Sequence, residues 1–209
     1  RDRLRTSSRA LLIFTRNPVP AKCKTRLAAT IGDPAALEIY LILLRHTAAI
    51  TAKLNDVDKL VYFSEHLGNG TIWDPVTFRY KLQEGTDLGQ RMQNAFEDAF
   101  EAGYSEVLII GSDMYNLNTS DLKEAFNRFM EAEVVLGPAQ DGGYYLLGLK
   151  GPIPKLFRNK AWGTHTVLKD TLEDLKDLKV SQLSVRNDID QYEDIAGIPV
   201  FETFAKKIK

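Results

Sequence analysis

Unbroken apolar runs alternate along the chain with stretches of helical periodicity. Two of these runs, Ala10–Thr15 and Val107–Ile110, contain almost no charged residue. Because neither alternates between polar and apolar positions, each predicts a strand buried on both faces, as in a parallel sheet between two helical layers. Between them, apolar residues recur at helical spacing from Ala36 to Ile50. Asp33 as N-cap and Pro34 at the first helical position predict a long helix there.

The remaining elements continue this alternation of strands and helices. Further strands are expected at residues 59–64, 77–82, 134–136 and 145–149. Four further helices are expected: one that begins at residue 24, one that ends at residue 99, and two at residues 121–132 and 167–178. Sustained alternation predicts βαβ units with right-handed crossovers. The expected fold class is therefore a three-layer α/β/α architecture with a mostly parallel central sheet. We expect one domain over residues 10–209, preceded at residues 1–9 by a disordered leader or a cloning remnant.

Composition excludes several classes of protein. The 209 residues are 44% hydrophobic and 26% charged, which is typical of a globular chain with one sizeable core. A formal net charge of -1 gives no reason to expect a nucleic-acid partner. The longest apolar run, Ile39–Leu44, is too short to span a bilayer, so we expect no membrane span. The single cysteine, Cys23, excludes an internal disulfide and fits a reducing compartment such as the cytoplasm.

The loop after the first strand carries two prolines and a cluster of cations. Pro18 and Pro20 keep it extended, and Lys24 and Arg26 lie where the next helix begins. Cations in the first turn of a helix cost a few tenths of a kcal/mol, roughly, so an anionic ligand would explain their placement. We therefore expect Lys24 and Arg26 to bind phosphates, although a solvated basic turn is the alternative. The loop contains neither a Walker motif nor a GxGxxG motif.

A second glycine-containing loop precedes the helix that ends near Ala99. Gly85 and Gly89 would let a ring or a ribose approach the backbone closely, and Arg91 could meet a phosphate or a carboxylate. Each of these signals is weak alone. Together they predict a nucleotide-binding role for Gly89 and Arg91.

Carboxylates follow two of the predicted strands. Asp113 comes directly after the run Val107–Ile110 and the pair Gly111-Ser112, and Asp188 and Asp190 end a late extended segment. Ligands of open α/β sheets collect beyond the carboxyl ends of strands, so these side chains should face one crevice. Carboxylates placed there suit Mg²⁺ or Mn²⁺ bridging phosphate oxygens. The alternative is that Asp113 merely caps a turn.

Six segments together resemble a known family: PVPAKCKTRL, DLGQRM, IIGSDMYNL, VLGPAQDGGYYLLGL, AWGTHTVLKDTL and NDIDQYEDI. In this order they resemble the bacterial DUF2064 family of nucleotide-diphospho-sugar transferase-like proteins, which have the glycosyltransferase-A fold. The resemblance extends from about Ala10 to the end of the chain. More distantly, the chain is similar to phospholactate guanylyltransferases and to molybdenum-cofactor nucleotidyltransferases. Two positions depart from the family pattern, Ala21 in place of a glycine and Tyr115 in place of a proline.

The resemblance implies roles for individual residues. Lys24 and Arg26 would lie near phosphates, Gly89 near the nucleoside, and Asp113 and Asp190 on the metal. The second substrate would lie near one group of residues, Asp141, Gly142, Gly143 and Trp162. From their positions beside this group, we add Tyr144, Gly163 and Thr164 to the expected second-substrate site.

Three functions are compatible with these residues. The first is a metal-dependent glycosyltransferase that uses a nucleotide-diphospho-sugar donor, an acceptor that the sequence does not identify, and Asp141 as the base. The second is a nucleotidyltransferase that joins an NTP to a small phosphorylated substrate and releases pyrophosphate. The third is a catalytically silent nucleotide-binding module. The stretch Asp141–Tyr145 offers a carboxylate and aromatic rings but no cation for a second phosphate, which favours glycosyl transfer.

Overall fold

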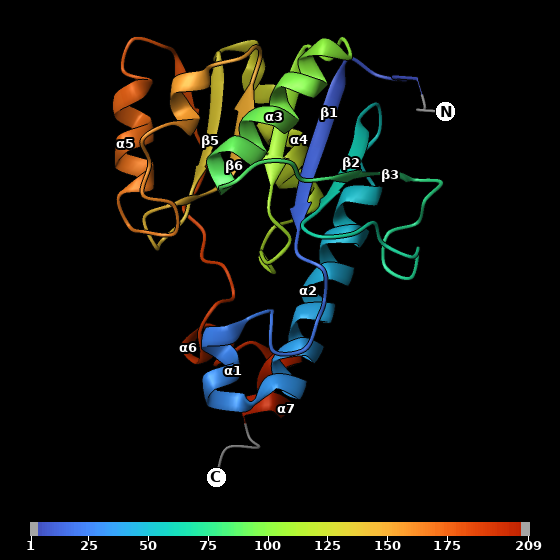
Figure 1. Ribbon diagram of the computed structural model, residues 1–209. Helices are drawn as coiled ribbons and strands as arrows, with labels where there is room; N and C mark the ends of the chain where they lie inside the picture. The colour runs from blue at the N-terminus through green and yellow to red at the C-terminus, as the bar shows by residue number, and fades with distance from the viewer. Residues whose placement is uncertain (1–3, 206–209) are drawn as a thin grey trace.

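The computed structural model describes residues 4–205 and shows a seven-stranded sheet with helices on both faces (Figure 1). The strands are β1 (Arg9–Thr15), β2 (Asp58–Phe63), β3 (Phe78–Leu82), β4 (Glu106–Ile110), β5 (Val134–Pro138), β6 (Tyr144–Leu149) and β7 (Val180–Gln182). Their order across the sheet is β3-β2-β1-β4-β6-β5-β7. The strand pairs are parallel except at β6, which runs antiparallel to β4 and β5. The predicted α/β class with a mostly parallel sheet is confirmed.

The predicted helices are present, although their bounds differ from the prediction by a few residues. They are α1 (Thr25–Ile31), α2 (Asp33–Ala52), α3 (Leu88–Glu101), α4 (Thr119–Asn127), α5 (Val167–Asp174), α6 (Tyr192–Ile195) and α7 (Glu202–Ala205), with 3-10 turns at Arg128–Met130, Pro154–Phe157 and Pro199–Phe201. Asp33 is the first residue of α2 rather than its N-cap, because Gly32, with φ 89°, occupies the cap. The helices expected over 121–132 and 167–178 end at Asn127 and Asp174.

Each face of the sheet has its own hydrophobic core. Along β1, Leu11 and Ile13 pack into the core that contains α2 and α4, whereas Ala10 and Leu12 pack into the core that contains α3. Successive side chains of a strand point to opposite faces, so an apolar residue at every position is what two cores require. The prediction that this run is buried on both faces is confirmed.

Helix α2 is long and apolar enough, by length and composition, to cross a membrane. Half of that stretch is buried inside the protein, where Ile39, Leu43 and Leu44 pack against the sheet. A core helix has the same composition, because one face must be apolar to cover a sheet. Here the packing of α2 accounts for its hydrophobicity.

The expectation of a disordered leader at residues 1–9 does not hold for residues 4–9; residues 1–3 lie outside the described part. The backbone N–H of Thr6 donates to Asp58 Oδ2 at 2.8 Å, and that of Ser105 donates to the Ser8 carbonyl at 2.9 Å. Arg9 already belongs to β1 and pairs with Glu106 at 3.2 Å. The polar composition of this segment concealed these contacts, since its side chains serve as hydrogen-bond partners rather than as core.

Helices α1, α6 and α7 gather beyond the end of the sheet toward which β1 points (Figure 1). Helix α1 contacts α2 and α6, and α6 contacts α7. The loop after β1 and the segment before α6 are far apart in the sequence. The fold brings them to the same carboxyl edge of the sheet, where the predicted site residues lie.

Candidate functional site

Two neighbouring cavities open at the carboxyl ends of β1 and β4. The first, here called the polar cavity, has a volume of about 630 Å³ and is lined in part by Arg16, Lys24, Gln83, Arg91 and Asp190. The second, here called the aromatic cavity, has a volume of about 260 Å³ and is lined in part by Ile109, Asp141, Tyr144, Trp162 and Asp188. Phe14, Leu88, Gly111 and Asp113 line both. One ligand could therefore extend from one cavity into the other.

Lys24 reaches across the polar cavity to the end of β4. Its ammonium Nζ lies 3.0 Å from Asp113 Oδ2, and its side chain is only 8% exposed. Burial alone would lower the pKa of Lys24, but the negative charge and the hydrogen bond of Asp113 outweigh burial and raise it. Lys24 therefore stays charged. A residue expected at a phosphate thus binds a residue expected at the metal.

Arg26 makes the second ion pair of the same kind. Its Nη1 lies 2.9 Å from Asp190 Oδ2 on the exposed side of the cavity. Asp194, a residue that the sequence reasoning missed, holds this segment in place. Its carboxylate accepts hydrogen bonds from the backbone N–H groups of Asp190 and Gln191 at 3.0 and 2.7 Å. The capping-box spacing of Gln191 and Asp194 was the signal available in the sequence.

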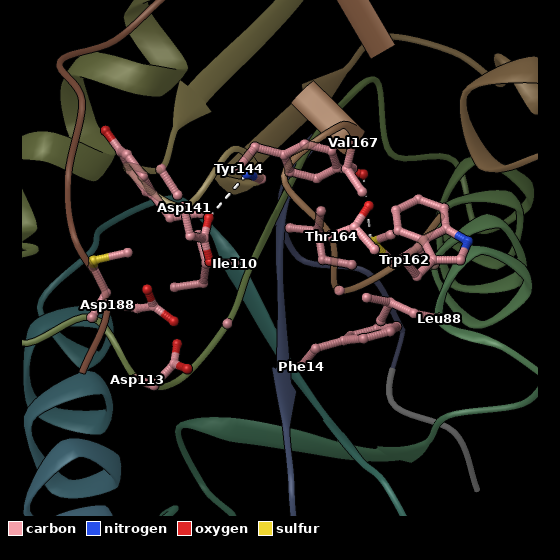
Figure 2. Close-up of a pocket in the computed structure, with 18 residues that line it drawn as sticks. Phe14, Leu88, Ile110, Asp113, Asp141, Tyr144, Trp162, Thr164, Val167 and Asp188 are labelled. Carbon is pink, nitrogen blue, oxygen red and sulfur yellow. Dashed lines mark hydrogen bonds between the residues drawn. The ribbon is translucent and has the colours of Figure 1, made fainter. Parts of the chain in front are cut away.

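Asp113, Asp141 and Asp188 share one side of the aromatic cavity (Figure 2). Burial, followed by the charges of Asp113 and Asp141, raises the pKa of Asp188 to about 6. Asp141 Oδ1 accepts a hydrogen bond from the Gly143 backbone N–H at 2.9 Å, which fixes the orientation of this carboxylate. Asp188 was expected only as a metal residue, so its place in this cavity is new information.

The carboxylates fit a divalent cation in part. Within residues 4–205, no three His, Cys, Asp or Glu side chains converge in a geometry ready for a metal ion. Asp113 and Asp190 instead face Lys24 and Arg26. The charge of Asp113, however, disfavours the charged form of Asp188, and Figure 2 shows the two carboxylates side by side. A divalent cation between them would remove this penalty, so this pair is the best candidate.

The opposite side of the aromatic cavity is apolar. Phe14, Leu88 and Trp162 face one another there (Figure 2). Gly89, expected near a nucleoside, lies under Trp162, where an added Cβ would come within 2.7 Å of the indole. In the structure this glycine lets the indole lie directly on α3. Its closeness to Trp162 is a packing role that the sequence alone did not suggest.

The Asp-Gly-Gly turn between β5 and β6 supports the neighbouring loop over residues 161–168. Gly142 has φ 90° and leaves no room for a Cβ beside the His165 backbone, and its carbonyl accepts from the Leu168 N–H at 2.8 Å. Gly143, Gly163 and Thr164, three of the residues expected at the second-substrate site, line the aromatic cavity. Gly142 differs from these residues, because it contacts the loop over residues 161–168 from behind and does not line the aromatic cavity.

Arg91 lines the polar cavity, but its guanidinium already donates hydrogen bonds to other residues of the protein. Arg91 Nε donates to the Gly85 carbonyl at 3.1 Å, and Nη1 donates to Gln83 Oε1 at 3.2 Å. The Gln83 amide in turn donates to the Thr15 and Tyr62 carbonyls at 3.1 and 2.9 Å. Gln83 and Arg16 are cavity residues that the sequence reasoning missed, since neither belongs to a distinctive motif.

Ala21 and Tyr115 were the two departures from the family pattern. Ala21 has φ 64°, a conformation that glycine adopts without steric cost. Tyr115 packs its ring against His46 and Phe201, at centroid distances of 4.8 and 5.2 Å. It belongs to the packing between α2 and the C-terminal segment.

Known proteins resemble the chain in sequence and fold. No curated protein matches the sequence. A crystal structure from Desulfovibrio desulfuricans G20 that carries the provisional name nucleotide-diphospho-sugar transferase is 27% identical, with a TM-score of 0.84 over 97% of this chain and 95% of that one. Lower identities accompany two further structures, which share the fold.

The inositol-1-phosphate CTP transferase of T. maritima is 15% identical, with a TM-score of 0.53 over 95% of each chain. Glucosyl-3-phosphoglycerate synthase from Mycobacterium tuberculosis, in complex with Mg²⁺ and UDP, is 12% identical, with a TM-score of 0.51 over 90% of this chain and 74% of that one. The expected nucleotide-diphospho-sugar transferase fold is thus confirmed.

The family described as "Uncharacterized protein conserved in bacteria (DUF2064)" matches residues 47–164. This chain belongs to the DUF2064 family.

Proposed function

We propose that this protein is a metal-dependent glycosyltransferase that uses a nucleotide-diphospho-sugar donor. The observation that carries the proposal is the pair of joined cavities, one with Arg16, Lys24 and Arg91 in its lining and the other lined by carboxylates and aromatic rings. The relatives of this fold are named transferases of nucleotide-sugars or nucleotides, so a transferase with a nucleotide substrate is supported. The finer assignment to glycosyl transfer rests on the second cavity.

The donor's diphosphate would lie in the polar cavity. Lys24 is buried and charged, and Arg26 lies nearby on α1, so both can make charge-assisted hydrogen bonds to phosphate oxygens. In the absence of ligand these cations are neutralised by Asp113 and Asp190. A bound diphosphate would take over the cations and leave both carboxylates free for a metal ion.

Asp113 and Asp188 would hold Mg²⁺ or Mn²⁺, with Asp190 joining them when Arg26 turns to phosphate. A divalent cation there offsets the charge that builds up on the departing nucleoside diphosphate. A structurally similar synthase was solved in complex with Mg²⁺ and UDP, which supports a divalent cation for this fold. The protein's own part is to direct oxygen ligands from the ends of two segments to one point.

Asp141 would take the proton from the acceptor hydroxyl. It lines the aromatic cavity, and the hydrogen bond from the Gly143 N–H leaves its second oxygen free. A general base must lie within hydrogen-bond reach of the proton that it removes, and Asp141 reaches the space between Asp188 and Tyr144 (Figure 2). Trp162, Gly163 and Thr164 would close the opposite side around the acceptor, while the sugar of the donor would lie on the side of the carboxylates.

Nucleotidyl transfer is the second candidate, because cytidylyltransferases share the fold. A phosphorylated second substrate would need cations in its cavity, and Asp113, Asp141 and Asp188 are the charged residues of the aromatic cavity within the described part of the chain. This charge distribution favours the glycosyl reaction. A catalytically silent module would be expected to bind nucleotides without turnover.

The test is a panel of nucleotide-sugars and NTPs incubated with the protein and Mg²⁺ or Mn²⁺, with separate assays for NDP and pyrophosphate. We expect NDP release from at least one nucleotide-sugar and about 100-fold slower turnover in Asp141→Asn, with unchanged donor affinity. Asp177→Asn, a carboxylate change away from both cavities, is the matched control. Pyrophosphate release from an NTP, without NDP release across the panel, would instead establish the nucleotidyltransferase.

A further inference from the structure

The aromatic cavity is divided into two chemically different halves. Its charged lining residues, within the described part of the chain, are Asp113, Asp141 and Asp188, and all three lie on one side. Large apolar side chains lie on the other side, among them Phe14, Leu88, Trp162 and Val167 (Figure 2). A ligand that fills the cavity must therefore present a polar group to one side and an apolar body to the other.

The apolar half has a fixed shape. Trp162 rests on Gly89, so its indole cannot sink further toward α3. The ring of Phe14 packs against that of Tyr62, with centroids 5.4 Å apart. The hydroxyl of Tyr144 faces Met92 Sδ at 3.9 Å, a weak partner. These walls offer few hydrogen bonds, so a polyhydroxylated body would leave buried hydroxyls unpaired there.

The charged half disfavours anions. A phosphate or a carboxylate in the metal-free cavity would lie beside three acidic side chains, and Lys24 is already paired with Asp113 on the side of the polar cavity. A cation held by Asp113 and Asp188 would be engaged by the diphosphate of the donor, so an anionic acceptor would still lie beside Asp141 and that diphosphate. Like charges at short distance raise the free energy of the complex, most strongly where water is partly excluded. A hydroxyl avoids this cost and can donate its hydrogen bond to a carboxylate.

We propose that the acceptor of this enzyme is an uncharged alcohol with an apolar body, preferably aromatic, that occupies the space between Phe14, Leu88 and Trp162. This inference rests on the glycosyltransferase function proposed above. In the reaction the acceptor oxygen bonds to the anomeric carbon, and the bond from that carbon to the phosphate oxygen breaks. The electron pair of this bond leaves with the nucleoside diphosphate, and the hydroxyl proton passes to Asp141.

Binding can be tested without turnover by following the NMR signals of the two tryptophans in the chain. Protein labelled with ¹⁵N-tryptophan gives one indole signal from Trp162, at the cavity, and one from Trp73, which is buried in the core and serves as an internal control. Trp162→Phe assigns the signals. The probes, added to the metal-free protein, are 4-methylbenzyl alcohol, its anionic analogue 4-(hydroxymethyl)benzoate, and glycerol as a small hydrophilic alcohol.

The neutral aromatic alcohol should shift the Trp162 signal alone, with a Kd about tenfold or more below that of the carboxylate. Glycerol should bind more weakly still. Equal or tighter binding of the carboxylate would overturn the inference, and so would the absence of any Trp162 shift with the aromatic alcohol at millimolar concentration.

A charge change on the apolar wall gives a second test. Leu88→Lys places an ammonium beside the cavity and should remove most of the discrimination against 4-(hydroxymethyl)benzoate. Leu82→Lys is the matched control, because Leu82 is 42% exposed, Leu88 is 43% exposed, and Leu82 lies on β3 at the sheet edge. Unchanged discrimination in Leu88→Lys would contradict the placement of the ligand.

The NDP-release assay separates the two proposals. The acceptor inference alone would be contradicted by two results together: a nucleotide-sugar is cleaved but the neutral alcohol does not accelerate its cleavage, and the carboxylate binds more tightly than the neutral alcohol. Selective binding of the neutral alcohol without any NDP release would sink the glycosyltransferase function and with it the acceptor role, while leaving the ligand preference of the cavity established.

Discussion

The ion pair between Lys24 and Asp113 links the two kinds of residue that a nucleotide site needs. Lys24 is 8% exposed and Asp113 is 35% exposed, so removing the carboxylate leaves a nearly buried ammonium without its partner. The pair of Arg26 and Asp190 differs, since the arginine side chain is 66% exposed. Loss of a partner costs far more when the remaining charge is buried than when water can solvate it.

The first prediction compares these two carboxylates. Asp113→Asn should abolish divalent-dependent nucleotide binding and lower the free energy of unfolding by about 1–2 kcal/mol, below the cost of breaking a fully buried pair because Asp113 is partly solvated. Asp190→Asn should weaken nucleotide binding and change stability by less than about 0.5 kcal/mol. Calorimetric titration with nucleotide and Mg²⁺, combined with urea unfolding, measures both quantities.

Lys24→Met in the Asp113→Asn background is the control for this experiment. It removes the unpaired ammonium, so stability should return toward that of the parent while nucleotide binding stays lost. If Asp113→Asn binds nucleotide and Mg²⁺ as tightly as the parent, Asp113 is not a metal ligand.

At the scale of elements, the loop over residues 161–168 depends on the turn between β5 and β6. Gly142 and Gly163 both have positive φ, 90° and 80°. Only Gly142 lies against another backbone, at His165; around Gly163 an added Cβ would meet open space. An alanine at Gly142 would therefore suffer both backbone strain and a steric clash, whereas an alanine at Gly163 would suffer backbone strain alone.

The second prediction uses this matched pair. Gly142→Ala should lower the free energy of unfolding by at least about 2 kcal/mol, because strain and overlap add. Gly163→Ala should cost about 1 kcal/mol from positive φ alone. Denaturant unfolding measures the difference, and the ¹⁵N signal of the Trp162 indole should shift in Gly142→Ala. Equal costs for the two variants would show that the loop moves away freely from the turn.

At the scale of the whole molecule, Asp58 ties the start of the chain to the sheet. Besides the hydrogen bond from the Thr6 N–H, it accepts from the Tyr104 hydroxyl at 2.6 Å and lies 3.4 Å from the Arg79 guanidinium. Burial alone would raise the pKa of Asp58, but the hydrogen bonds from Thr6 and Tyr104 and the charge of Arg79 outweigh it and lower the pKa below 3.8.

The third prediction concerns the pH dependence of this link. A carboxyl with a lowered pKa in the folded state stabilises the protein fully above its unfolded pKa of about 3.9, and that contribution is lost as the pH falls through the folded value. Asp58→Asn should cost about 2 kcal/mol at pH 7 and much less near pH 2. Asp56→Asn, a change at an exposed carboxylate nearby, is the control. Thermal unfolding between pH 2 and pH 7 decides it, and a cost in Asp58→Asn that does not change with pH would contradict the linkage.

The sequence by itself determined the fold class and pointed to several residues that the structure brings to one edge of the sheet. Unbroken apolar runs specified strands buried on both faces, and the position of Asp113 after such a run placed it at the carboxyl edge of the sheet. These features depend on local periodicity and on chain direction, which a sequence contains directly. The expected second-substrate residues Asp141, Gly143 and Trp162 likewise line one cavity.

Only the tertiary structure decided which of these residues meet. In the structure Lys24 pairs with Asp113, and Arg26 pairs with Asp190. Asp188 lies near Asp141, and Gly89 and Gly142 are needed for close packing. The tertiary structure also ordered residues 4–9 through Asp58, and it inserted β6 antiparallel between β4 and β5. Such contacts join residues up to 164 positions apart, as for Arg26 and Asp190, and they follow from the packing of whole elements. Local patterns contain no information about that packing, which is why the sequence could not specify them.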